Sequence, residues 1–69
     1  MTSSTAALMY GSIVKAPAGA AARLISDAVM GHRGSARVLC SELEHLARCD
    51  AGGELFLARL PEIRRQLGL

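Results

Sequence analysis

Apolar residues recur along the chain at intervals of three and four, the spacing that places side chains on one face of an α-helix. Glycine, proline and small polar residues divide this pattern into four segments, each of which we expect to be helical. These segments cover residues 5–15, 17–30, 35–49 and 54–67. No stretch shows the strict alternation of apolar and polar residues that is typical of a half-buried strand.

The boundary between the first two predicted helices lies at Pro17. Proline fits the first turn of a helix and disfavours helical geometry at the residue before it. Ser3 or Ser4 is the expected N-cap of the first helix, because a serine hydroxyl can accept a backbone N–H there. In the second helix the shared apolar face consists of Ala21, Leu24, Ile25 and Ala28.

Residues 31–34, with the sequence Gly-His-Arg-Gly, form the clearest predicted turn. We expect Gly31 to end the second helix and Ser35 to cap the third. The third helix has the most regular amphipathic pattern, with an apolar stripe of Ala36, Leu39, Leu43 and Leu46. On its opposite face, Glu44 and Arg48 are spaced as a favourable i,i+4 ion pair.

The fourth segment places Phe56, Leu60, Ile63 and Leu67 on one helix face. Pro61 interrupts this pattern, so we expect the helix to break or bend near Leu60. Asp50 is a possible cap for this element, and Gly68 is the expected stop after it.

Length and composition favour a single domain covering residues 1–69. The 69 residues are 51% apolar and only 3% aromatic. Area scaling gives roughly 10,000 Å² for the unfolded chain and roughly 4,000 Å² for the folded one, near the lower limit for an independent core. A multidomain enzyme and a disordered tail are excluded. We predict an all-α fold, with four short helices in a compact orthogonal array or small bundle, assembled as a homodimer.

Four residues of metal-ligating type invite a search for a zinc site: His32, Cys40, His45 and Cys49. Their spacing is unfavourable, because strong zinc signatures pair ligands two to four residues apart at a turn. On one helix, Cys40 also points about 140° away from His45. We predict no metal site, with Cys49 packed as a small apolar residue, Cys40 near the surface and both histidines solvated. The two cysteines would lie about 13 Å apart on one helix, too far for a disulfide.

The hypotheses of a catalytic site are weak because the residue spacing is again unfavourable. Cys40 and His45 diverge on a helix, and Ser35 beside His32 is better explained as a helix cap. Residues 31–34 lack the spacing of a phosphate-binding loop. A domain of this size also has little interior from which to form a desolvated pocket. We therefore predict a protein that is not an enzyme and takes no cofactor.

Nucleic-acid binding is the second hypothesis. Two helices joined by a short turn containing glycine have the outline of a helix-turn-helix motif. Arg33 and Arg37 would then begin the recognition helix, with Arg64 and Arg65 as further phosphate contacts. The net charge of +2 is too small to establish this by itself. Glu42 and Glu44 follow closely, and the chain has no aromatic platform for stacking bases.

The preferred hypothesis comes from surplus apolar surface. Leu8, Met9 and Tyr10 surround the first helix rather than forming one stripe. The fourth segment likewise has more apolar residues than one helix face can hide. The partner-binding residues that we predict are Leu55, Phe56, Leu57, Leu60, Ile63 and Leu67. Apolar residues on several faces of a small helix indicate a protein partner, either a larger protein or a second copy.

The remaining signals concern origin and location. No secretory signal or membrane span is predicted, and two cysteines are too few for a disulfide scaffold, so we expect a cytoplasmic protein. Seven of the eight cations are arginine, which suggests a GC-rich bacterium or one of its phages. In size and composition the chain looks like the small helical regulatory or accessory proteins of such organisms. No motif carries this resemblance, and it transfers no functional residues.

Overall fold

A computed structural model of the chain shows an all-helical fold. It describes the backbone of residues 2–32 and 35–69 and the side chains of residues 6–30 and 35–69. The helices are α1 (Thr2–Lys15), α2 (Ala18–His32), α3 (Ala36–Arg48) and α4 (Glu54–Gln66). The described part of the chain contains no strand. The predicted all-α class with four helices is confirmed.

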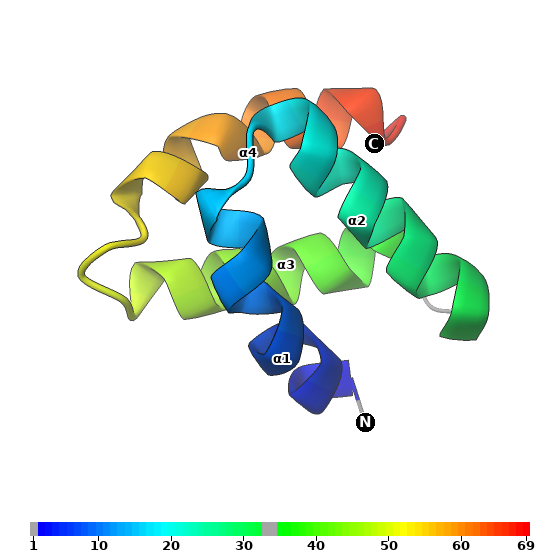
Figure 1. Cartoon of the computed structure of the whole chain (residues 1–69), viewed down its shortest axis with the longest axis horizontal. Helices are drawn as coiled ribbons and strands as arrows, with labels where there is room; N and C mark the ends of the chain where they lie inside the picture. Colours follow the sequence, from blue (N-terminus) through cyan, green and yellow to red (C-terminus); the bar gives the residue numbers. More distant parts are fainter. Residues whose placement is uncertain (1, 33–34) are drawn as a thin grey trace.

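The four helices cross one another rather than aligning in one direction. α4 lies above α3 in Figure 1 and runs in the opposite direction. α2 descends beside them, and α1 crosses α3. The radius of gyration is 10.6 Å, against about 11 Å expected for a compact chain of this length. The accessible surface is 4403 Å², close to the area expected from the scaling relation.

The core contains side chains from all four helices. Its largest fully buried members are Phe56, Ile13, Ile25, Leu43, Ile63 and Cys40. Tyr10 packs edge-on against Phe56, with ring centroids 6.2 Å apart and an interplanar angle of 79°, a geometry that aromatic pairs prefer. No polar residue is fully buried among the described side chains. Burial of apolar side chains from all four helices therefore holds this core together.

Two predicted caps are corrected by the backbone. α1 begins at Thr2, so Ser3 and Ser4 lie inside the helix and not at its N-cap. α2 continues through His32, so Gly31 does not end it. A glycine inside a helix costs only about 1 kcal/mol relative to alanine and cannot by itself terminate one. The rest of that predicted turn, residues 33 and 34, lies outside the described residues.

Two other caps are confirmed. Ser35 is the N-cap of α3, and its hydroxyl accepts the backbone N–H groups of Arg37 at 3.2 Å and Val38 at 3.4 Å. Gly68 ends α4 with a left-handed φ of 81°. The N–H groups of Gly68 and Leu69 donate to the carbonyls of Arg65 and Arg64, which is the Schellman pattern.

The start of α4 differs from the prediction. Gly53 is its N-cap and provides no side-chain hydrogen bond. The Asp50 carboxylate accepts the Gly52 N–H at 3.3 Å and the Tyr10 hydroxyl at 2.8 Å. Asp50 therefore connects the α3–α4 loop to α1 and does not cap α4.

Of the predicted break or bend near Leu60, the break does not occur, because α4 continues through Pro61. Pro61 is exposed, whereas Leu60 and Ile63 on either side are buried in the core. The buried neighbours hold both halves of the helix, so the missing N–H does not interrupt it.

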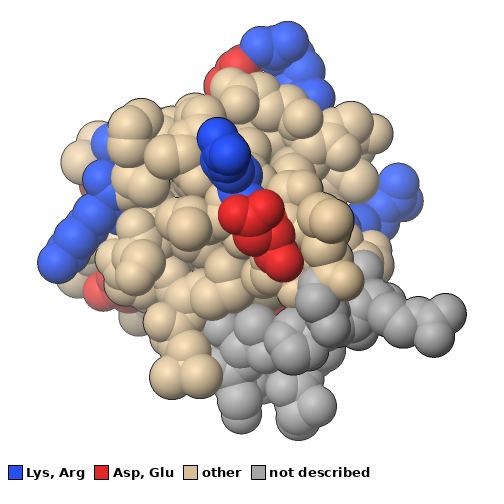
Figure 2. Space-filling model, turned by 45° about the vertical axis from the view of Figure 1, so that its right-hand side comes forward, with Lys and Arg blue, Asp and Glu red and all other residues tan. Residues whose placement is uncertain are grey.

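The surface carries scattered charges. On the face shown in Figure 2, the negative side chains lie beside positive ones, and these small groups are separated by uncharged atoms. None of the described helices is both long and apolar enough to cross a membrane.

Candidate partner-binding groove between α3 and α4

An open groove of about 470 Å³ lies between α3 and α4. Its polar lining comes from Glu44 and Arg48 of α3 and Arg64 of α4, and its apolar lining from Leu57, Leu60 and Pro61 of α4. α3 and α4 pack antiparallel with their buried faces toward each other. The residues beside those buried faces form the walls of the groove.

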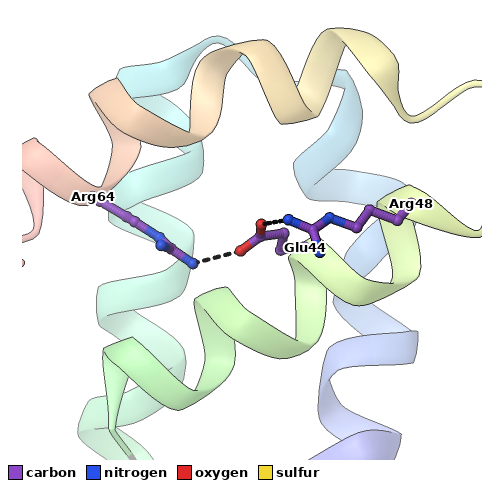
Figure 3. A network of polar contacts seen from close by, with 3 residues as sticks. All are labelled: Glu44, Arg48 and Arg64. Atoms are coloured by element: carbon purple, nitrogen blue, oxygen red, sulfur yellow. Dashed lines mark hydrogen bonds and ion pairs between the residues drawn. The ribbon is translucent and has the colours of Figure 1, made fainter.

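Glu44 is the centre of a polar network in the groove (Figure 3). Its Oε1 accepts an N–H from Arg64 Nη2 at 2.8 Å, and its Oε2 accepts one from Arg48 Nη2 at 2.5 Å. The Arg48 pair is the i,i+4 contact that the sequence predicted. The Arg64 pair joins two helices, and the separation of 20 residues gives no local signal for it.

The network has more positive than negative charge. Two guanidinium groups share one carboxylate, and each oxygen of that carboxylate already accepts an N–H. Arg48 is 68% exposed, Arg64 37% and Glu44 25%. Each arginine has five N–H donors, so donors remain after the contacts with Glu44. The groove therefore presents a net positive rim to solvent.

Leu57 and Pro61 contribute apolar surface to the groove. The groove thus combines apolar side chains with arginine donors.

Cys40 lies beneath this network and is fully buried. Burial raises the pKa of its thiol, and the neighbouring Arg64 guanidinium partly opposes the rise. Cys49 is exposed at the C-cap of α3. The prediction that Cys49 is packed and Cys40 lies near the surface is therefore wrong for both residues. The buried face of α3 includes Cys40 and Ala47, and this leaves Cys49 exposed.

The predicted partner-binding residues divide into two groups. Phe56, Leu60 and Ile63 belong to the core. Phe56 and Ile63 are fully buried, whereas Leu60 also lines the groove. Leu55 is 69% exposed, and Leu57 and Leu67 are half-buried. The surplus apolar character of α4 is explained in part by contacts with three neighbouring helices.

The arginines predicted to contact nucleic acid differ in exposure and in their ion-pair partners. Arg37 is exposed at the start of α3. Arg64 pairs with Glu44, and Arg65 donates to Glu62 from Nε at 3.0 Å and from Nη2 at 2.5 Å. Arg65 and Gln66 hold the pKa of the Glu62 carboxyl below its usual range. Arg33 lies outside the described residues.

The residues considered for zinc do not assemble among the side chains that the structure describes, where no three His, Cys, Asp or Glu groups come together. His45 is exposed, as predicted, whereas the His32 side chain lies outside the described residues.

A second hollow, of about 450 Å³, lies between α2 and α4. Arg23 and Asp27 balance each other in its lining, which is otherwise small or polar except for Leu67. The α3–α4 groove has the larger apolar share and the unbalanced charge.

No protein-family model, curated protein or solved structure matches this chain.

Proposed function

We propose that the protein is a small, non-catalytic protein-interaction module. It regulates, inhibits or adapts a larger protein by binding one of that protein's segments in the α3–α4 groove. The observation that supports this proposal is the combination of apolar side chains and an arginine rim in one open groove. Protein interfaces commonly bury an apolar centre inside a polar rim in which arginine is enriched.

The proposed site differs from the six partner-binding residues predicted from the sequence of α4. Leu57 and Leu60 remain in it, and Arg48, Pro61 and Arg64 join them. Burial of Phe56 and Ile63 in the core favours this shift, because a partner could reach them only by unfolding the domain.

The decisive experiment compares capture of proteins from a lysate of the source cell by the wild type and two variants. Arg48→Glu reverses a charge on the groove rim, whereas Arg65→Glu reverses a comparably exposed charge that pairs with Glu62. We expect a protein captured by the wild type and by Arg65→Glu to be lost with Arg48→Glu. Equal capture by all three proteins, or by none, contradicts the proposal. Far-UV circular dichroism verifies that both variants are folded.

We further propose that the module is a homodimer in the cytoplasm of a bacterium or of a phage-infected cell. Leu8 and Met30 support self-association, since they are 82% and 78% exposed. Solution mass by light scattering tests it, and a single monomeric species at high micromolar concentration would contradict it.

A small DNA-binding regulator of helix-turn-helix type is the second candidate. One observation favours it: the exposed residues of α3 are Arg37, Val38, Ser41, His45 and Arg48, which include no carboxylate. Against it, Arg48 is already paired, and the face in Figure 2 has no continuous positive patch. Fluorescence anisotropy with random duplex DNA at about 50 mM salt tests this candidate, because phosphate contacts weaken steeply with salt. Absence of binding at that salt eliminates it.

A further inference from the structure

We infer that the α3–α4 groove is selective for a partner segment in which an Asp or Glu side chain stands beside a leucine-like apolar side chain. This inference rests on the proposed function and adds the chemistry of the partner. It follows from the charge and the apolar lining of the same groove.

Charge selects the acidic group. The described rim contains two guanidinium groups and one carboxylate, and both oxygens of Glu44 already accept hydrogen bonds. A partner carboxylate meets net positive charge and unused N–H donors on Arg48. A lysine or arginine on the partner would instead meet two cations whose shared anion is occupied. Charge complementarity of this kind contributes mainly to specificity and association rate.

The apolar lining selects the neighbouring side chain. Leu57 is half-buried and Pro61 exposed, so both leave apolar surface open to a ligand, whereas Leu60 is nearly buried beneath them. The lining and the rim face one volume of about 470 Å³, enough for a side chain or two but small for a whole helix. A Leu, Ile or Phe anchor therefore lies within reach of the arginines only if the acidic residue is close to it in the partner.

Glu44 has a specific role in this scheme. It holds the two arginines in position and also competes with the partner's carboxylate for their donors. Replacing it by glutamine removes the competing charge and leaves a side chain of the same shape. We therefore expect Glu44→Gln to strengthen binding of an acidic partner, an effect opposite to that of an ordinary contact mutation.

The experiment has two stages. In the first, the immobilised full-length chain selects peptides from a random display library at about 50 mM salt, where exposed charges are only partly screened. We expect enriched peptides to place Asp or Glu within a few residues of Leu, Ile or Phe. Enrichment of neutral or basic peptides overturns the inference but leaves the proposed function. Failure to enrich any peptide counts against the proposed function itself.

The second stage measures the most enriched peptide by fluorescence anisotropy, beside a matched version in which each acidic residue is replaced by its amide. Arg48→Gln should weaken the acidic peptide about twofold to fivefold, the range for exposed ion pairs. Glu44→Gln should strengthen it by a similar factor. Neither change should alter the amide version. The control Arg65→Gln, on α4 but outside the groove lining, should leave both peptides unaffected. Equal loss in Arg48→Gln and Arg65→Gln, or weaker binding in Glu44→Gln, overturns the inference.

Discussion

Replacing Gly53 by alanine should destabilise the fold strongly, because two backbones meet at this residue. Gly53 is buried between the end of α3 and the start of α4. An added Cβ would lie 2.8 Å from the Cα of Ala47 and 2.9 Å from its carbonyl carbon, and closer still to the carbonyl oxygen. These are backbone atoms of a residue that is itself buried, so a side-chain rotation cannot relieve the overlap.

The magnitude follows from the kind of relaxation required. Forcing extra volume into a packed site costs about 1–3 kcal/mol. A chain of this length has a total stability of only about 3–10 kcal/mol. In a domain of this size each 1 kcal/mol lowers Tm by about 4–8 °C. We therefore expect Gly53→Ala to lower Tm by about 4–24 °C, and to disturb the α3–α4 packing that places Arg64 beside Glu44.

Two other glycines, Gly52 and Gly11, provide matched controls. At Gly52 the nearest atom to an added Cβ is an Asp50 carboxylate oxygen at 3.9 Å, and at Gly11 nothing lies within 4 Å. Gly52→Ala should change the free energy of unfolding by less than about 0.5 kcal/mol. Gly11→Ala, inside α1, should be stabilising by about 0.5–1 kcal/mol. The assay is thermal and urea unfolding followed by far-UV circular dichroism. Equal midpoints for Gly53→Ala and Gly52→Ala would refute the reasoning.

Three further predictions concern side chains that tertiary contacts define. Burial, followed by the hydrogen bond to Asp50, raises the pKa of Tyr10 to about 12 from its usual 10. The neutral Tyr10 hydroxyl therefore adds to the free energy of unfolding below pH 10, and this stabilisation is lost as the pH rises through 12. Urea midpoints across that range should show the loss in the wild type and not in Tyr10→Phe. Arg59 donates from Nη1 to two carbonyls at the end of α1, at 3.2 Å and 2.8 Å. Arg59→Ala should lower the free energy of unfolding by about 1–3 kcal/mol. An unchanged urea midpoint would contradict a stabilising role for these two hydrogen bonds. A thiol reagent should modify Cys49 rapidly in the folded protein and reach Cys40 only on unfolding, whereas equal rates would contradict the assigned burial.

Arg59 shows what only the tertiary structure reveals about a charged side chain. In the sequence it lies five residues before Arg64, and no neighbouring residue indicates what it contacts. In the fold its guanidinium donates to the carbonyls of Val14 and Ala16, which precede Pro17. These carbonyls lie at the end of α1, where the helix leaves its last acceptors without intrahelical donors. The partner is 43 to 45 residues away, a distance over which helical periodicity carries no information.

The amphipathic pattern determined most of the secondary structure by itself. Burial of Leu39, Leu43, Phe56 and Ile63 follows from helical spacing, since residues three and four apart share a face in any helix. The ends at Ser35 and Gly68 were also predictable, because each depends on hydrogen bonds within a few residues of chain.

Tertiary structure decided which part of each helix is buried and what its polar side chains contact. α3 packs against three other helices, so its buried arc extends to Cys40 and Ala47 and excludes Cys49. α4 passes through Pro61 because the core holds both of its halves. The groove itself depends on Arg64 reaching Glu44 from another helix. Such contacts depend on how helices are placed relative to one another, and the local periodicity of a sequence does not contain that placement.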